Sequence, residues 1–248
     1  MPEGDTVWRT ANALRPRLVG KRLLEVRPER LSRLAGATVT AIDTNGKHLL
    51  IHLDSGLVLH THLRMTGSWH LYRPGEAWRK PERQARLVLA NESTEAVLFN
   101  APVVELLRER EAARELAHLG PDILAPEFNL EEVLRRARAG DRQALGELLL
   151  DQRVAAGIGN IYKCESLWRL GLDPWQRADQ LTDEELGALF GEARGLMQAA
   201  LRGRVPHAVH GRAGRGCPRC RSRIGCRNQG DPPRFTYYCP TCQGAGLR

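Results

Sequence analysis

Cysteines near the C-terminal end of the chain are the clearest candidates for chemistry. Five of the six lie at or after Cys217, and four of them form two CxxC pairs, Cys217 with Cys220 and Cys239 with Cys242. Each pair can sit on a tight knuckle, so four thiolates can converge tetrahedrally on one zinc ion, while Cys226 is not needed as a ligand. Because so small a module cannot bury its own core, we expect one structural zinc ion to stabilise a C-terminal zinc ribbon.

The charge of the chain indicates its kind of partner. The 248 residues carry a formal net charge of +8, and the isoelectric point is near 9.6. Excess cations favour a polyanion such as nucleic acid or an anionic membrane surface, although charge alone also fits a merely basic protein. No apolar run is long enough to span a membrane, and the charged start is unlike a signal peptide. We therefore expect a cytoplasmic protein, where reducing conditions favour metal binding over disulfides.

Strand-like segments follow a short helix in the first part of the chain. Asp5 or Thr6 can cap a helix whose apolar residues recur at helical spacing as far as Leu18. The period then falls to near two, and Asn45-Gly46 and Ser55-Gly56 are good hairpin signals. The predicted strands cover residues 23–26, 38–42, 49–53, 57–62, 69–72, 86–89 and 96–99. Short strands at this spacing favour a β-sandwich or a barrel.

Helical patterns are predicted from about Val103 onward. A capping residue, Asn129, precedes one helix, and Thr182 with Glu185 forms a capping box before a long one. The predicted helices cover residues 130–139, 144–150, 161–170 and 183–201. Cys164 is expected in the core of its helix, and the Arg-, Gly- and His-rich residues 203–216 are expected to form a flexible basic linker.

Three segments, together with the cysteine module, resemble the bacterial formamidopyrimidine-DNA glycosylase and endonuclease VIII family. The start Met-Pro-Glu-Gly-Asp is similar to the Pro-Glu start of that family. Residues 150–162 are similar, almost residue for residue, to its helix–two-turn–helix signature, and residues 45–50 resemble the strand with its catalytic-site lysine. The segments also occur in the order of the family. The resemblance implies a DNA-repair glycosylase that also cuts the DNA backbone.

Pro2 and Glu3 are the residues that this chemistry would use. Base removal with strand cleavage needs an amine that attacks C1′ of the sugar and forms a Schiff base. An α-amino group has a pKa near 7.7–8.0, against about 10.4 for lysine, so an N-terminal amine is substantially unprotonated at neutral pH. Pro2 can serve only after Met1 is removed, and Glu3 can then move protons during ring opening and elimination. Alone, Pro2-Glu3 could be an ordinary start sequence.

Phosphate contacts are implied for further residues of the matched segments. The resemblance places Lys47 and Arg234 beside the phosphates at the lesion, with Arg234 at the tip of the ribbon hairpin. Gly157 and Gly159 permit close backbone approach, and Asn160 adds a side-chain donor at a helix start. The plain alternatives are a solvated lysine, a rim arginine of the ribbon and an ordinary turn between helices.

A flipped nucleotide leaves a gap that the enzyme must fill. Glycosylases cannot reach C1′ inside a stacked duplex, so they extrude the nucleotide. The segment His62–Met65 resembles the loop that supplies an intercalating side chain in the family, and Met65 is our candidate. A methionine of the core is the alternative.

Departures from the formamidopyrimidine branch point to the endonuclease VIII branch. The start is not Pro-Glu-Leu-Pro-Glu, and residues 96–102 lack the Arg-Arg-Phe-Gly stretch that fills the gap in the other branch. The segment 202–216 is also short for the loop that covers a flipped 8-oxoguanine. The resemblance therefore implies an enzyme for oxidised pyrimidines with β,δ-elimination. A formamidopyrimidine-type enzyme and a non-catalytic protein that binds damaged DNA remain as alternatives.

These patterns combine into a multi-domain α+β protein. We expect an N-terminal β-sandwich with a leading helix at 1–118, a helical helix–two-turn–helix domain at 122–205 and a zinc ribbon at 211–248. Damaged DNA would bind in a basic cleft between the lobes. We expect a monomer of the bacterial cytosol and nucleoid, with no membrane partner and no small-molecule cofactor. Zinc would be structural.

Overall fold

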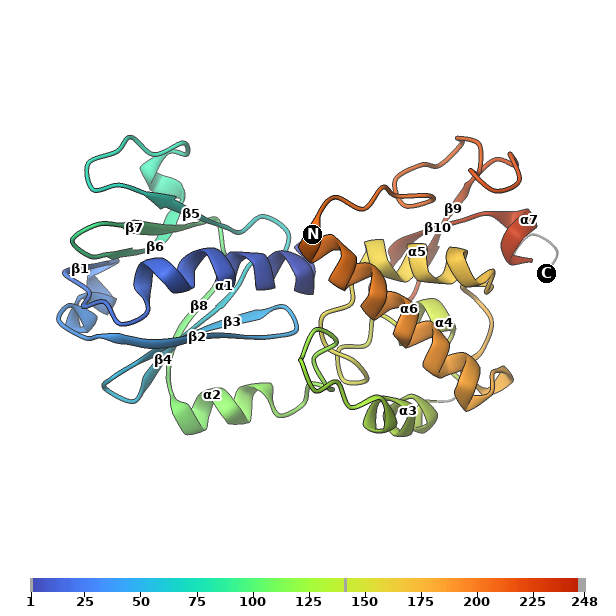
Figure 1. Cartoon of the computed structure of the whole chain (residues 1–248), viewed down its shortest axis with the longest axis horizontal. Coiled ribbons are helices and arrows are strands. Elements are labelled where there is room, and N and C mark those ends of the chain that lie inside the picture. Colours follow the sequence, from blue (N-terminus) through green and yellow to red (C-terminus); the bar gives the residue numbers. More distant parts are fainter. Residues whose placement is uncertain (1, 141, 245–248) are drawn as a thin grey trace. The chain divides into compact units, whose positions relative to one another are not determined.

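The computed structural model describes residues 2–140 and 142–244 (Figure 1). Contacts divide them into two compact units. Pro2 and Thr6–His118 form the first unit, and Glu3–Asp5 join the residues from Leu119 onward in the second. Within this part of the chain, no helix combines the length and the apolar character needed to cross a membrane.

The first unit is a sandwich of two antiparallel sheets. One sheet has the strand order β1-β6-β7-β5 and the other the order β2-β3-β4-β8. The strands are β1 (Glu25–Arg27), β2 (Val39–Asn45), β3 (His48–Leu53), β4 (Leu57–His62), β5 (Ser68–Tyr72), β6 (Ala85–Ala90), β7 (Glu95–Phe99) and β8 (Val103–Arg108). Short 3-10 helices lie at Glu29–Leu34 and Glu82–Gln84, and helix α2 (Glu109–Leu116) ends the unit. The expected β-sandwich is confirmed.

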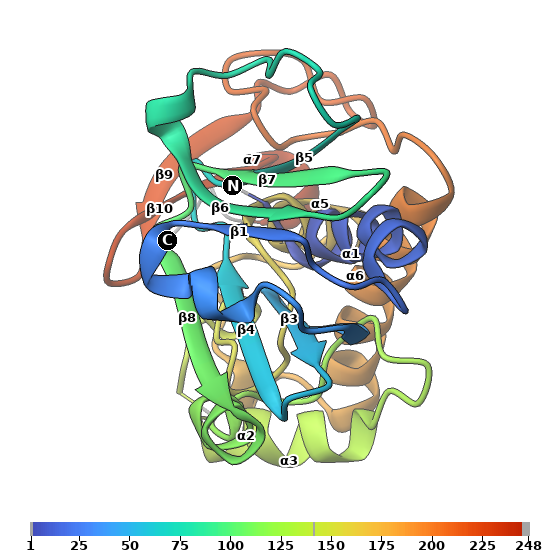
Figure 2. The same cartoon turned by 90° about the vertical axis from the view of Figure 1, so that its left-hand side faces the viewer.

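One hydrophobic core joins the two sheets to helix α1 (Gly4–Leu18). Figure 2 shows the ribbons of the two sheets and of α1. The helix contributes apolar residues at the predicted spacing, from Val7 to Leu18, and all of them are buried. In β3 the buried residues alternate with less buried ones, so Leu49 and Ile51 face the core. The alternation of apolar and polar residues that predicted the strands therefore also indicates which side chains face inward.

The prediction of helices from Val103 onward is wrong at its start. Residues Val103–Arg108 form strand β8, and helix α2 begins only at Glu109. Strand β8 pairs with β4 along its whole length, from His62 opposite Val103 to Leu57 opposite Arg108. The Glu-Leu-Leu-Arg stretch has good helix formers, but the free edge of β4 offers backbone partners that override this local preference.

Helices build the core of the second unit. They are α3 (Leu130–Ala139), α4 (Leu145–Leu148), α5 (Asn160–Leu170) and α6 (Asp183–Arg202), with a 3-10 turn at Ala178–Gln180. The predicted caps are confirmed: the side chain of Asn129 accepts a hydrogen bond from the N–H of Glu132, and Thr182 and Glu185 form the capping box of α6. The helices share a buried cluster that includes Ile158 and Phe190.

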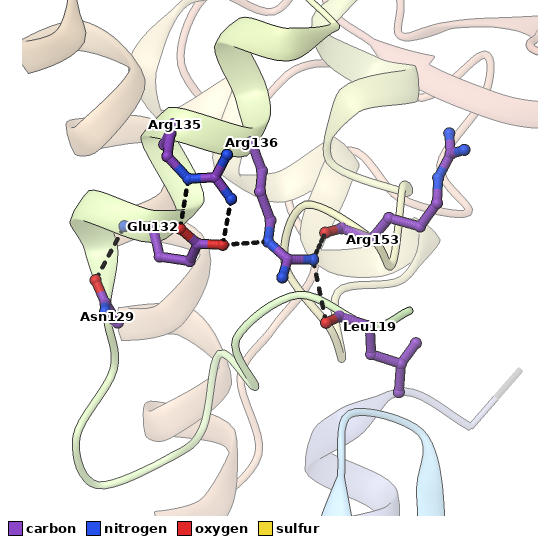
Figure 3. Close-up of polar contacts among 6 residues, drawn as sticks. All are labelled: Leu119, Asn129, Glu132, Arg135, Arg136 and Arg153. Atoms are coloured by element: carbon purple, nitrogen blue, oxygen red, sulfur yellow. Dashed lines mark hydrogen bonds and ion pairs between the residues drawn. The ribbon is translucent and has the colours of Figure 1, made fainter. Parts of the chain in front are cut away.

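Arg136 connects helix α3 to the segment that precedes α5 (Figure 3). Its guanidinium group donates to the carbonyl oxygen of Leu119 at 3.2 Å and to that of Arg153 at 2.8 Å. Glu132 holds the same guanidinium group at 2.6 Å and also binds Arg135. The turn before α5 is therefore fixed to α3 through its own backbone.

The C-terminal hairpin belongs to the second unit. Strands β9 (Gly225–Gln229) and β10 (Arg234–Tyr238) pair, and the short helix α7 (Pro240–Gln243) follows. The small core of this ribbon combines Val209 and Ile224 with buried cysteines. The prediction of a flexible linker at residues 203–216 is wrong for residues 208–210, because the Glu165 carboxylate accepts hydrogen bonds from the N–H groups of Ala208, Val209 and His210.

Candidate active site and metal centre

The carboxylate of Glu3 lies at the start of helix α5. Glu3 is 2% exposed, and its Oε1 accepts a hydrogen bond of 2.8 Å from the N–H of Ile161. The next residue is fixed as well, because the N–H of Gly4 donates to the carbonyl oxygen of Gly157 at 3.0 Å. The first turn of a helix has unpaired N–H groups and a positive dipole end, which stabilise a negative charge. The signature segment thus holds a carboxylate from the other end of the sequence.

Glycines of the signature segment leave room for that carboxylate. A Cβ atom added to Gly159 would lie 2.3 Å from Cδ of Glu3, far inside contact distance. Gly157 has a φ of 110°, which side chains rarely allow. Its N–H donates to Oε1 of Gln152, so this group is already used within the protein. The phosphate contacts expected of these glycines stay a prediction.

Pro2 and Lys47 both belong to the first unit. Pro2 is partly buried and lies two residues before the start of α1, with Glu3 between them. Lys47 occupies the turn between β2 and β3 and is only 7% exposed, so it is not a solvated surface lysine. A buried ammonium group must be compensated by nearby polar or charged groups, and such positions are more often functional than exposed ones.

A group of histidines lies beside Lys47 on strands β3 and β4. Nδ1 of His48 and Nε2 of His60 are 2.8 Å apart, and the rings of His48 and His62 meet edge to face. Burial, together with repulsion from His62 and His60, lowers the pKa of His48 to about 3. Burial also lowers the pKa of His62 to about 4, with Arg64 and Lys47 adding repulsion. Both imidazoles are therefore uncharged at neutral pH, which limits positive charge around Lys47.

Asn160 and the hairpin strand β10 are linked by a side-chain contact. The Nδ2 group of Asn160 donates to the carbonyl oxygen of Phe235 at 2.8 Å. Arg234, the preceding residue, is exposed at the start of β10. The helix start and the hairpin residue, which are expected to contact phosphate, thus lie on segments that touch each other. Because Nδ2 has two hydrogens, it can still donate one to another acceptor.

Lys163 is a site residue that the sequence reasoning missed. It is fully buried on α5, and its Nζ donates to Oγ1 of Thr236 at 2.7 Å. Oγ1 of Thr236 in turn donates to Oε1 of Gln229, so these hydrogen bonds connect Lys163 to both strands of the hairpin. Burial lowers the pKa of the Lys163 ammonium, an effect that the Cys164 thiol and the Glu3 carboxylate partly offset. Lys163 and Arg234 also line one cavity of about 310 Å³.

Glu165 is a second residue that was missed. Its carboxylate is 4% exposed, and its oxygens accept the three N–H groups that fix the loop after α6. The signal available in the sequence was a charged residue among the buried residues of a helix, because a buried charge needs a partner. The partners lie far away in sequence, so the pattern alone could not identify them.

Met65 lies in the turn after β4 and is 60% exposed, so the alternative of a core methionine is wrong. The turn itself is fixed: the N–H of Gly67 donates to the carbonyl oxygen of Leu63, and Oγ1 of Thr66 donates to that of Asn100. An unbranched apolar side chain on a fixed turn is well suited to a wedge between bases.

The four cysteines of the two CxxC pairs come together at the base of the ribbon. Their Sγ atoms all lie within 4.8 Å of one another, with 3.9 Å between Cys217 and Cys242 and 3.4 Å between Cys220 and Cys239. A tetrahedral zinc ion with Zn–S distances of about 2.3 Å separates its sulfur ligands by roughly 3.8 Å. The donor set and its spacing therefore fit zinc. Cys164 is buried as expected, and Cys226 lies on β9 outside the cluster.

Comparison with known proteins follows the same division of the chain. Residues 1–102 match the formamidopyrimidine-DNA glycosylase N-terminal domain, and residues 119–207 match the formamidopyrimidine-DNA glycosylase H2TH domain. The probable endonuclease 8 2 of Streptomyces coelicolor is 42% identical, over 98% of this chain and 94% of that protein. The DNA-(apurinic or apyrimidinic site) lyase Nei2 of Mycolicibacterium smegmatis is 35% identical, over 99% of this chain and 100% of that protein.

Solved structures show the same fold. The MutM (Fpg) protein of Thermus thermophilus superposes with a TM-score of 0.82 at 31% identity, covering 98% of this chain and 99% of that one. The Lactococcus lactis formamidopyrimidine-DNA glycosylase, which was solved with DNA containing an AP site, gives a TM-score of 0.85 at 23% identity, covering 97% of this chain and 99% of that one. At 23% identity, the similarity to the Lactococcus lactis structure concerns the fold alone.

Proposed function

The chain belongs to the formamidopyrimidine-DNA glycosylase and endonuclease 8 family, and on that premise we propose that it excises oxidised pyrimidines from damaged DNA. The activity class is DNA glycosylase and AP lyase, in keeping with relatives over the whole chain. The observation that carries the proposal is the buried Glu3 carboxylate at the start of α5, directly after Pro2. A protein that only binds damage has no need for that arrangement.

Pro2 is the proposed nucleophile once Met1 has been removed. The lone pair of its nitrogen forms a bond to C1′ while the glycosidic bond breaks, and the base leaves with the electron pair and takes up a proton. Ring opening then gives an iminium ion, the Schiff base. Loss of the C2′ proton expels the 3′ phosphate, and loss of the C4′ proton expels the 5′ phosphate. Water finally hydrolyses the iminium ion and frees the amine.

Glu3 is the proposed proton carrier for these steps. Its carboxyl group can protonate the ring oxygen as the sugar opens and can accept protons during elimination. The Ile161 N–H fixes one oxygen of the carboxylate, which sets the direction in which the group acts. Catalysis by a general acid or base requires such fixed geometry within hydrogen-bond reach of the substrate.

Lys47, Asn160 and Arg234 are the proposed phosphate contacts, and Met65 is the proposed wedge in the gap left by the flipped nucleotide. Support comes from the burial of Lys47, the link from Asn160 to the Arg234 strand and the exposure of Met65. Gly157 and Gly159, whose backbone also lies close to Gly4 and Glu3, complete the set of proposed DNA contacts. Damaged DNA is thus the proposed partner, bound by a monomer.

Zinc is the proposed ion of the cysteine cluster. The residues Cys217, Cys220, Cys239 and Cys242 would fill all four positions, so the ion would have a structural role. Bound zinc would fix the knuckles from which β9 and β10 extend. The residues of the hairpin, Arg234 among them, would then be held for DNA binding.

The preference for oxidised pyrimidines is tested with matched lesions. We expect single-turnover excision of 5,6-dihydrouracil or thymine glycol to be well above that of 8-oxoguanine in the same duplex. The relatives named endonuclease 8 and the lack of the Arg-Phe pair support this order. The same duplex with a preformed abasic site controls for the lyase step. Faster release of 8-oxoguanine would place the chain in the other branch, and no release of any base would leave only a binding function.

A further inference from the structure

The ribbon hairpin exposes an aromatic ring that none of the proposed steps uses. Phe235 is 60% exposed and directly follows Arg234 on β10. Because side chains alternate along a strand, Phe235 and Tyr237 share one face of the hairpin, and Arg234 and Thr236 share the other. Single exposed apolar residues are common on protein surfaces, so the surroundings decide whether this one has a function.

Further rings continue this face of the hairpin. The ring of Tyr237 meets the ring of His210 edge to face at 5.1 Å, and His210 meets His207 in the same way at 5.4 Å. We call Phe235, Tyr237, His210 and His207 the aromatic row. Its two ends, Phe235 and His207, are the exposed members. Phe235 belongs to the row by its place on the same face of β10, and an exposed ring offers a surface on which an unpaired base can stack.

The aromatic row is held in place on both sides. The carbonyl oxygen of Phe235 accepts the Asn160 side chain at 2.8 Å, and Glu165 fixes the backbone of His210. Burial, together with repulsion from His207, lowers the pKa of His210 to about 4, so the ring is uncharged at neutral pH. Rings fixed before binding lose little conformational entropy when a ligand stacks on them.

We propose that the aromatic row binds unpaired DNA, with a base stacked on Phe235 and a phosphate bound by Arg234. Bases and phosphates of a single strand project in opposite directions, so a ring and a cation on alternate sides of a strand can take one each. Bases of an intact duplex are already stacked on one another and cannot reach the ring. The inference rests on the proposed function, since a flipped lesion leaves unpaired nucleotides near Asn160 and Arg234.

The test measures binding to undamaged DNA, which requires no glycosylase activity. A fluorescein-labelled oligothymidine and a duplex of equal length are titrated by fluorescence anisotropy with the zinc-loaded full chain. We expect Phe235→Ala to weaken single-strand binding by roughly 5-fold to 100-fold and to change duplex binding by less than about 2-fold. Phe235→Trp should retain single-strand affinity, whereas Phe235→Leu, which is apolar but cannot stack, should lose it.

Leu24→Ala is the matched control, because Leu24 is 57% exposed but lies in the first unit. Zinc content and circular dichroism verify that each variant is folded. The proposal is overturned if the wild-type chain does not bind oligothymidine, if Phe235→Ala binds it as tightly as the wild type, or if Phe235→Leu restores binding. Excision of dihydrouracil by the wild type is measured separately, so a failure of the proposed function is distinguished from a failure of this inference.

Discussion

The sandwich core and the ribbon core differ in what fills them. The sandwich core is made of aliphatic side chains from two sheets and α1, such as Leu14, Ile51 and Leu98. In the ribbon core, three of the five fully packed residues are cysteines, and only Val209 and Ile224 are aliphatic. Burial of apolar surface stabilises the first region, whereas the second has too little of it to fold on that basis alone.

The sandwich and the ribbon therefore hold their functional side chains in place in two different ways. Lys47 lies in a turn of a sheet whose position follows from hydrophobic packing. Arg234 and Phe235 lie on a hairpin whose position depends on the four-cysteine cluster and on contacts with α5. Conditions that remove metal should therefore release the hairpin and leave the sandwich intact.

The largest effect is expected from loss of Cys239, one of the four proposed zinc ligands. Cys239→Ser should release zinc, unfold the ribbon and abolish binding to abasic-site DNA, because apparent zinc-binding energies of about 10–16 kcal/mol are folding energy in such modules. Metal content and hydrogen exchange of the two units give the readout. The strands of the sandwich should keep their protection, and Cys226→Ser is the matched control. Tight DNA binding by the zinc-free protein would contradict the distinction between the two cores.

The next effect concerns the space that Gly159 leaves for Glu3. Gly159→Ala places a Cβ atom 2.3 Å from Cδ of Glu3, so the carboxylate must move, and even a displacement near 1 Å can reduce a catalytic rate about 100-fold. We expect base excision to fall by at least that factor, while zinc content is unchanged. Gly191→Ala on α6 is the control, since a Cβ atom there meets nothing within 4 Å. Normal excision by Gly159→Ala would show that the position of Glu3 is not needed.

A smaller effect is expected from acid, and it should appear in the sandwich. His62 has a pKa of about 4 in the folded chain against 6.5 for an ordinary histidine, so the unfolded chain binds more protons in between. The stabilisation is complete above pH 6.5 and is lost as pH falls toward 4, by on the order of 2 kcal/mol at pH 5. Stability from pH 7 to 5 can be followed by urea unfolding.

The variant His62→Asn tests that assignment. Asparagine retains an acceptor for the Arg64 N–H but carries no titrating proton, so its unfolding free energy should depend less on pH. An equal acid sensitivity of His62→Asn and the wild type would rule out this source of it.

Local sequence patterns predicted the parts of the fold that depend on local rules. The alternation in β3, the caps Asn129 and Thr182 and the spacing of the CxxC pairs each specify a structure within a few residues. Strand β8 was missed because its pairing with β4 is decided across a long stretch of chain, against its helix-forming residues. Lys163 and Glu165 were missed for the same reason, since Thr236 and the loop at 208–210 lie far from them in sequence.

Borohydride trapping shows whether the amine of Pro2 forms the Schiff base. With an abasic duplex, we expect a covalent enzyme–DNA complex whose adduct lies on the N-terminal peptide, with Met1 gone. A chain with a retained Met1 or an N-terminal tag should lose trapping but keep its zinc and its DNA binding. Trapping at the normal rate with a blocked N-terminus would contradict the claim and make Lys47 the leading candidate nucleophile.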